Sequence, residues 1–449
     1  MLTDVHVSLA HLDDASWIVT GYLIGYVAAL PLMGRVSDVH GRRPVYLLAL
    51  LVFAFGSLLC ATARSLPWLV AARVVQAIGG GATLPVTLAL VGDLVPSNRR
   101  ALPLGIIGAA AEAGGVVGPV YGAGIVQAWG WRWIFLINLP LAGLIAAFVW
   151  RAMPASGQPV DAGEPAAYGR PGKAVDYLGA ALFACSITAL TVGLSGAGNP
   201  LTSRSPIELK RAVPLTLLAL LAGVAFVWRQ ARAASPLLPL GMLRHRFSAA
   251  ANTVNFFIGV ALIAAMVDVP LFAATVLGRS PLTSGLALLR LTVCIPVGAI
   301  AGGWLVHRLG VRVTGVSGLV AAAAGFLLMS GWSLHVTDPA MTPGLVLAGI
   351  GFGLVIAPVI FAALEPVEER DRGLASALVM VMRMVGMTVG LAALTSVAFF
   401  RFNQLVSNVQ LPFQRSGETA AAYAQRFQAY EEAIAQAGQA VFSGVFSIA

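Results

Sequence analysis

Apolar runs of about 20 residues recur along almost the whole chain, separated by short polar segments. Each run is long enough to cross a hydrocarbon layer roughly 30 Å thick as a helix. The runs are continuous rather than alternating, which favours helices over the strands of a membrane barrel. Charged residues make up only 10% of the 449 residues, whereas soluble proteins carry about 25%. The sequence therefore predicts an all-α integral membrane protein.

The pattern predicts twelve complete spans and the beginning of a thirteenth. The thirteenth begins near Gln439 and reaches Ala449 before it is long enough to cross a membrane. The twelve are expected near residues 16–34, 45–63, 67–93, 101–128, 131–150, 176–197, 212–231, 247–277, 281–306, 313–334, 341–363 and 374–401.

The spans are expected to fall into three parts. Residues 1–150 form an N-terminal bundle, residues 151–246 form a cytoplasmic linker with two inserted helices, and residues 247–449 form a C-terminal bundle. Residues 402–438 are expected to be extracytoplasmic. Apolar residues recur at helical spacing over Thr419–Phe442, which overlaps the end of this segment. This spacing predicts a surface helix or a helical hairpin.

The basic residues, which give the chain a net charge of +9, lie mostly between the apolar runs. With the 34–44 loop placed inside, sixteen Lys and Arg fall on the inner side and nine on the outer side, as the positive-inside rule expects. This orientation puts Met1 outside, so a preceding helix is expected and the complete protein would have fourteen. No basic face with interleaved aromatic residues indicates a nucleic-acid partner, and the three cysteines lack metal-ligand spacing.

Ionisable residues inside the predicted spans are the strongest candidate site, because charges in a bilayer are costly and usually functional. Glu112 and Arg383 lie at similar depths from the inner side, and Asp268 and Arg290 at equal depths from the outer side. Pairing would lower the desolvation cost of each charge. The alternatives are permanent structural ion pairs, or a contact of Glu112 with Arg290. Protonation of a carboxylate would free its arginine and bias two conformations.

A short charged loop, Gly34–Pro44 (GRVSDVHGRRP), joins two of the spans. It resembles the signature loop between the second and third helices of the major facilitator superfamily of secondary transporters. The resemblance makes Asp38 the acid of a conformational latch, with Arg42 or Arg100 as its partner and Arg43 as a further basic residue. Gly303–Arg312 is a degenerate copy in which His307 replaces the acid, which favours two parallel repeats.

Two further segments carry the resemblance. Gly114–Gly122 (GGVVGPVYG) allows close helix contact through its small residues, and its proline weakens the backbone ladder. It resembles the antiporter motif of exporters, represented here by the residues Gly114, Gly118, Pro119 and Gly122. Leu69–Gly81 resembles the fourth-helix motif whose arginine, here Arg73, is implicated in proton coupling. Ala77 stands where the family usually has Gly.

The resemblance extends over nearly the whole chain. The two extra spans in the middle look like those of the fourteen-helix drug:proton antiporter branch. The strings Thr20–Tyr26, Asp268–Phe272 and Arg383–Met387 are similar to those of actinobacterial multidrug and triacylglycerol exporters, which act with a periplasmic lipoprotein. The first helix of that branch, which carries an acid involved in coupling, is not present in this sequence.

The implied fold is that of the major facilitator superfamily: two pseudo-symmetric bundles plus two linker helices, with the first helix missing and the last truncated. The implied function is proton-coupled antiport that exports hydrophobic or amphiphilic drugs or lipids by alternating access. A monomer in the cell membrane, driven by the proton gradient without cofactor or metal, is expected. A non-transporting fragment and an intramembrane lipid-modifying enzyme are the alternatives from other classes, and nutrient uptake is the alternative among transporters.

Overall fold

The described part of the chain is entirely helical in its regular elements. The computed structural model describes residues 12–94, 107, 114, 118, 121–152, 175–196, 206–233, 236–238, 240–365, 372–407, 409, 412–413 and 419–448. The N-terminal part contains α2 (Leu12–His40), α3 (Arg42–Ala61), α4 (Leu66–Leu94), α6 (Arg132–Leu136) and α7 (Asn138–Ala152), followed by α8 (Tyr177–Gly196) and α9 (Pro206–Arg232). The C-terminal part contains the short 3₁₀ helix η2 (Leu240–Arg244), α10 (Arg246–Thr275), α11 (Pro281–Ser330), α12 (Asp338–Leu364), α13 (Arg372–Val406) and α14 (Ala420–Ile448).

The predicted spans and the observed helices agree closely. Ten helices among the described residues are long and apolar enough to cross a membrane. One of them, Leu282–Ser330, covers the two spans predicted at 281–306 and 313–334, and the other nine match one predicted span each. The remaining span, predicted at 101–128, lies largely outside the described residues, although 121–129 are helical. The chain is a multi-pass membrane protein.

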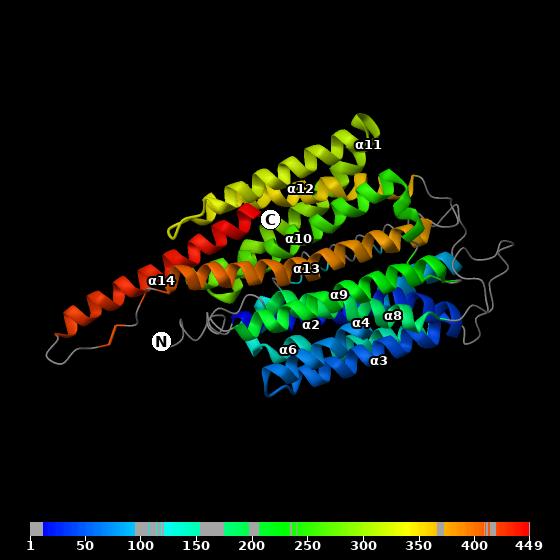
Figure 1. Cartoon of the computed structure of the whole chain (residues 1–449), viewed down its shortest axis with the longest axis horizontal. Coiled ribbons are helices and arrows are strands. Elements are labelled where there is room, and N and C mark those ends of the chain that lie inside the picture. Colours follow the sequence, from blue (N-terminus) through cyan, green and yellow to red (C-terminus); the bar gives the residue numbers. More distant parts are fainter. Residues whose placement is uncertain are drawn as a thin grey trace.

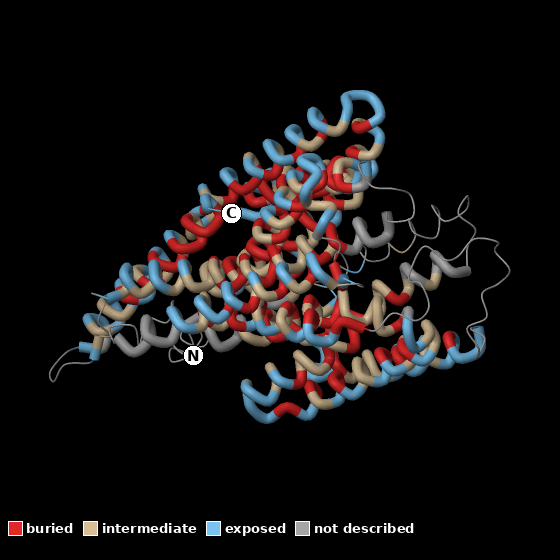
Figure 2. Tube along the Cα trace, turned by 45° about the vertical axis from the view of Figure 1, so that its right-hand side comes forward, coloured by how far each residue is buried: buried red, intermediate tan, exposed pale blue. Residues whose placement is uncertain are grey.

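The helices gather into an N-terminal and a C-terminal group (Figure 1), which meet directly where α2 packs on α13. In the first group α4 packs against both α2 and α3, and in the second α10 packs on α13 and α11 on α12. The inserted helices α8 and α9 pack together, and α8 contacts both α2 and α13. Ile24, Phe183, Phe226 and Leu378 share one apolar cluster at this seam. Figure 2 shows buried residues along the helix faces that meet one another. The division of the chain at residues 150 and 246 stays a prediction.

The segments 34–44 and 303–312, the first of which was expected to be a loop, are helical except for one glycine each, and both glycines turn through the same backbone conformation. Gly41 separates α2 from α3 with φ 91° and ψ 147°. Gly310 breaks α11 into two helices with φ 83° and ψ 166°. A side chain would strongly disfavour a positive φ of this size, so glycine is required at both turns. Each glycine lies seven residues after the glycine that opens its motif, at 34 and 303, which supports an internal repeat.

The end of the chain differs from the sequence prediction. α13 continues to Val406, and α14 runs from Ala420 to Ile448 as one helix. The helical hairpin is therefore wrong, because no proline interrupts α14. The final span expected from Gln439 is the second part of this one helix. Figure 1 shows the first half of α14 extending beyond the other helices, whereas its second half lies against them. The first half of α14 is therefore a single helix, and its location at a membrane surface stays a prediction.

A buried polar cluster joins the inserted helices. Asp176 caps α8 by accepting a hydrogen bond from the backbone N–H of Gly179 at 2.9 Å. The same carboxylate accepts from Arg229 Nε at 2.7 Å and from Gln230 Nε2 at 3.0 Å. Gln230 Oε1 in turn accepts from the backbone N–H of Leu237 at 2.6 Å. One carboxylate thus holds the start of α8, the end of α9 and the chain that follows α9.

Asp176→Asn is expected to lower the free energy of unfolding by about 1–3 kcal/mol, the usual value of hydrogen bonds to a charged group. Burial raises the pKa of the Asp176 carboxyl, but the bonds from Gly179, Arg229 and Gln230 outweigh burial and hold this pKa below its usual value. The stabilisation is therefore complete above the unfolded pKa of about 3.9 and is lost as the pH falls through the lower folded value.

Thermal unfolding of the purified protein between pH 3 and pH 7 checks this dependence. The control is Glu431→Gln, which removes an exposed carboxylate. Equal midpoints for Asp176→Asn and the wild type at pH 7 would contradict the assignment.

Candidate functional site

A cavity of about 650 Å³ lies where the two groups of helices meet. Helices α2, α3, α4 and α7 line it from one side, and α10 and α13 contribute one residue each from the other. Its lining consists of Tyr22, Leu23, Tyr26, Phe53, Arg73, Gln76, Gly114, Gly118, Asn138, Met266 and Met384. Most of these side chains are apolar or aromatic, and Arg73 is the charged residue among them. A mostly apolar cavity with a few fixed polar groups is the usual form of a small-molecule site.

Arg73 is held in place by neutral groups. Its Nη1 donates to Gln76 Oε1 at 2.6 Å and its Nε donates to the backbone oxygen of Ile18 at 3.4 Å. The guanidinium carbon lies 4.0 Å from the centroid of the Tyr22 ring, within the range of a cation–π contact. Among the described residues no carboxylate pairs with Arg73. Arg73, which its motif singled out, therefore lies at the cavity. Its charge is stabilised by the amide of Gln76, the backbone carbonyl of Ile18 and the ring of Tyr22.

Gln76 connects Arg73 to a second layer of polar groups. Its Nε2 donates to Ser57 Oγ at 2.7 Å, and Ser57 Oγ also accepts from Asn138 Nδ2 at 3.5 Å. Gln76 and Ser57 are fully buried. The sequence prediction missed Gln76 and Asn138 as site residues. Two features of the sequence could have identified them. Both are polar residues inside apolar runs, and the three-residue spacing from Arg73 to Gln76 places these two on one helix face.

Three glycines of the antiporter-like motif, Gly114, Gly118 and Gly122, lie among the described residues. Among the described residues, no atom lies within 4 Å of the position that a Cβ would take at Gly114, Gly118 or Gly122. Gly114 and Gly118 line the cavity instead. The absence of side chains at Gly114 and Gly118 leaves space open at the cavity, and the close helix contact expected from the motif stays a prediction. Pro119 lies outside the described residues.

Arg383 on α13 is bound to a buried asparagine that sequence analysis did not select. Its Nε donates to Asn255 Oδ1 at 3.2 Å, and Asn255 Nδ2 donates to the backbone oxygen of Val379 at 2.5 Å. Asn255 is fully buried on α10. The proposed partner of Arg383, Glu112, lies outside the described residues, so their pairing stays a prediction.

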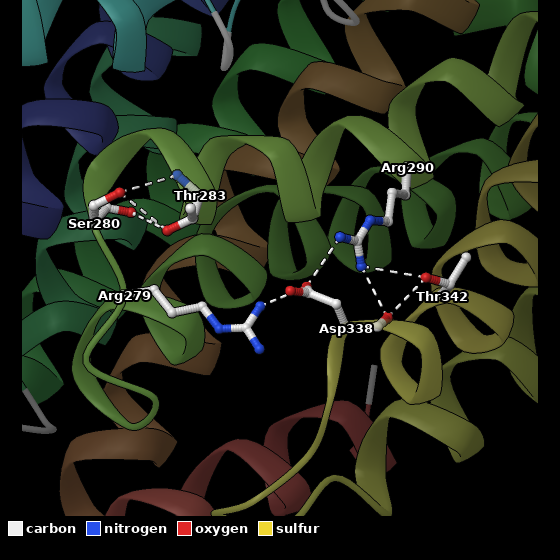
Figure 3. A network of polar contacts seen from close by, with 6 residues as sticks. All are labelled: Arg279, Ser280, Thr283, Arg290, Asp338 and Thr342. Atoms are coloured by element: carbon white, nitrogen blue, oxygen red, sulfur yellow. Dashed lines mark hydrogen bonds and ion pairs between the residues drawn. The ribbon is translucent and has the colours of Figure 1, made fainter.

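The second predicted ion pair has a different partner. Arg290 does not bond Asp268; its Nη2 lies 2.9 Å from Asp338 Oδ1, and its Nη1 donates to Thr342 Oγ1 at 3.2 Å and to the backbone oxygen of Asp338. Arg279 Nη1 donates to the same carboxylate oxygen at 2.5 Å. Figure 3 shows Asp338 between the two guanidiniums.

The pairing of Asp268 with Arg290 is therefore wrong in this structure. Equal depth fixes a height along the membrane normal but not a direction around the helix axis. The long Arg290 side chain reaches the start of α12 instead. Asp268 is half-buried on α10, and no partner for it occurs among the described residues.

The structure describes Arg42 and Arg43 of the predicted latch, whose pairing with Asp38 stays a prediction. Arg42 Nη1 donates to Ser37 Oγ at 2.6 Å. Arg43 Nη2 donates to the backbone oxygen of Trp150 at 2.9 Å and its guanidinium lies 4.5 Å from the ring centroid of the same residue. Arg43 thus ties the loop to the end of α7, a contact that the sequence did not reveal. The side chain of Asp38 and all of Arg100 lie outside the described residues. In the second copy, His307 lies edge-on to Phe361.

A bundle of membrane-crossing helices around a cavity that both halves of the chain line is the architecture of a secondary transporter. The model of the Major Facilitator Superfamily matches residues 1–391, and the chain belongs to this family. It is a transporter, and neither the family nor its relatives indicate an enzyme.

The relatives of this chain include actinobacterial transporters. The chain is 38% identical over 416 residues to a triacylglyceride transporter of Mycolicibacterium smegmatis, covering 90% of this chain and 72% of the relative. It is 36% identical over 448 residues to a triacylglyceride transporter of Mycobacterium tuberculosis, covering 95% and 84%. The resemblance stated from local strings is confirmed.

Solved structures show the same fold at low identity. A peptide transporter of the POT family in an auto-inhibited state matches with a TM-score of 0.58 and 18% identity, over 97% of this chain and 88% of that one. A human organic anion transporter matches with a TM-score of 0.57 and 19% identity, over 95% and 83%.

Proposed function

We propose that the protein exports hydrophobic or amphiphilic compounds, lipids in the first place, in exchange for protons by alternating access. The observation that carries the proposal is the cavity between the two halves. Its described lining residues combine Leu, Phe, Tyr and Met side chains with one charged residue, Arg73. Apolar substrate surface fits such a lining because its burial is favourable without hydrogen-bonding requirements.

The relatives favour a lipid over other apolar compounds. Those from Mycolicibacterium smegmatis and Mycobacterium tuberculosis are both described as triacylglyceride transporters. Two flexible methionines, Met266 and Met384, face the cavity and suit acyl chains of variable shape. A periplasmic lipoprotein that accepts the lipid remains part of the proposal on the resemblance alone, as do the monomeric state and export of drugs.

Proton coupling is assigned to the embedded ionisable residues Glu112, Asp268, Arg73 and Arg383. A membrane potential supplies about 2.3 kcal/mol per charge per 100 mV, so a proton gradient can drive export without a cofactor. The loop residues Asp38, Arg42, Arg43 and Arg100 would stabilise one of the two conformations from the inner side.

Inverted membrane vesicles from cells that express the protein test this function. An acid vesicle interior is set up and followed with a pH-sensitive acridine dye, and a fluorescent triacylglyceride is then added. We expect the lipid to enter the vesicles while the dye signal recovers, because each transport cycle releases protons. Vesicles without the protein and vesicles with a collapsed gradient are the controls. Lipid uptake that leaves the proton gradient unchanged would reject antiport, and lipid movement out of the vesicles would indicate uptake into cells.

A further inference from the structure

We propose that Arg73, Tyr22 and Asn138 form a subsite for the ester carbonyl groups of a neutral glycerolipid. The acyl chains of this lipid would extend toward Met266 and Met384. The inference rests on the proposed lipid substrate and adds which part of the lipid is recognised and by which groups.

The polar and apolar parts of the cavity lining are separated. The polar groups come from α2, α4 and α7 of the N-terminal part, whereas α10 and α13 contribute only Met266 and Met384. An amphiphile in this cavity is most stable with its polar end toward the N-terminal part. In the opposite orientation its polar end would lie beside the methionines, which offer it no hydrogen-bond donors. A volume of about 650 Å³ is that of a drug-sized pocket, so the glycerol core and the first part of the chains fill it.

Arg73 retains donors for a ligand. Its Nε and one N–H of Nη1 are used by Ile18 and Gln76, and no described residue accepts from Nη2. A guanidinium carries five N–H donors in a planar fork. The remaining donors can therefore serve carbonyl oxygens that enter the cavity.

The groups around Arg73 favour a neutral acceptor over an acid. Its charge is already stabilised by the Tyr22 ring at 4.0 Å and by the amide oxygen of Gln76. An ester carbonyl is an acceptor of the same kind as these amide and backbone oxygens, and it brings no charge that must be desolvated. A carboxylate ligand would have to lose its hydration on entering the cavity.

The subsite is fixed before the ligand arrives. Gln76 is anchored by Ser57 at 2.7 Å. The Tyr22 hydroxyl lies 3.1 Å from the position of a Cβ at Gly80, so the absence of a side chain there makes room for the ring that covers Arg73. Groups that are already ordered lose little conformational freedom on binding, which raises affinity.

Equilibrium binding to the purified full chain in lipid nanodiscs, without any proton gradient, tests the subsite. The two probes are trioleoylglycerol and its trialkyl ether analogue, which has the same chains and no carbonyl groups. We expect the wild type to bind the ester about 10-fold more tightly, the effect of roughly 1.4 kcal/mol of lost hydrogen bonding. In the Arg73→Gln variant the ester should bind more weakly, whereas the affinity for the ether should not change. The two affinities should therefore become similar. The control Arg64→Gln, an exposed arginine outside the cavity, should keep the 10-fold preference.

A second variant keeps the test decisive if Arg73→Gln does not fold. Tyr22→Phe retains the ring over Arg73 and removes only the hydroxyl, and it should reduce the preference for the ester. Equal ester and ether affinities in the wild type, or tighter binding of oleate than of trioleoylglycerol, would overturn the subsite. An Arg73→Gln protein that loses proton-driven transport but keeps the ester preference would also overturn it.

The outcomes separate this inference from the proposed function. Equal binding affinities for the ester and the ether analogue, together with export of both, would reject the carbonyl subsite. The proposed lipid export would be unaffected by that result. Failure to bind either compound, together with absence of lipid transport in the inverted vesicles, would reject the lipid substrate itself and the subsite with it.

Discussion

Arg383→Gln is expected to abolish proton-driven export, with a fall in rate of roughly 100-fold or more, equivalent to about 2.7 kcal/mol. Arg383 lies within a membrane-crossing helix, and its guanidinium is directed by Asn255, which is itself fixed by the backbone oxygen of Val379. A charge at this place is costly to keep and is therefore expected to act in the transport cycle. Glutamine retains a hydrogen-bond donor of similar reach. It removes the positive charge with which a carboxylate could pair, and from which that carboxylate could separate when it is protonated.

The rate is measured in the inverted-vesicle assay at equal protein levels. Arg401→Gln is the matched control, because it makes the same change on the same helix at an exposed position; it should transport normally. Near-normal proton-coupled export by Arg383→Gln would remove Arg383 from the coupling machinery.

Glu112→Gln is expected to cause a loss as large as that of Arg383→Gln. If the two residues act as a pair, the double variant should be no worse than either single variant, because each change already removes the interaction. Additive losses would favour the alternative in which Glu112 faces another basic residue.

Gly386→Ala is expected to destabilise the protein by about 3 kcal/mol, the upper part of the usual range for overpacking. A Cβ at Gly386 on α13 would overlap the backbone oxygen of Phe256 on α10, and a Cβ at Gly259 on α10 would overlap the backbone oxygen of Arg383. Backbone atoms cannot rotate away as side chains do, so α10 and α13 would have to separate. Since these two helices position Arg383, export should fall together with stability.

The thermal midpoint of the purified protein, followed by size-exclusion chromatography after heating, measures this effect. Gly143→Ala on α7 is the control, because no described atom lies within 4 Å of its added Cβ. A midpoint for Gly386→Ala equal to that of the control would mean that the helices do not approach as closely as described.

The sequence alone was sufficient to predict which segments form membrane-crossing helices. An apolar run of membrane length must satisfy its backbone hydrogen bonds internally, so it becomes a helix whatever surrounds it. This rule found Arg246–Thr275 and Asp338–Ala363 within a few residues. The rule does not reach α14, where a mixed polar and apolar run formed one helix that continues through Gln439.

The partners of the embedded charges required the tertiary structure. Hydropathy gives the depth of a residue, but contact also depends on the rotation of each helix and on the reach of its side chain. Arg290 therefore binds Asp338 rather than Asp268. Gly114 and Gly118 line a cavity, and the guanidinium of Arg73 lies over the ring of Tyr22. Local backbone energetics determined which segments cross the membrane, whereas packing between segments distant in sequence decided which groups face the cavity together.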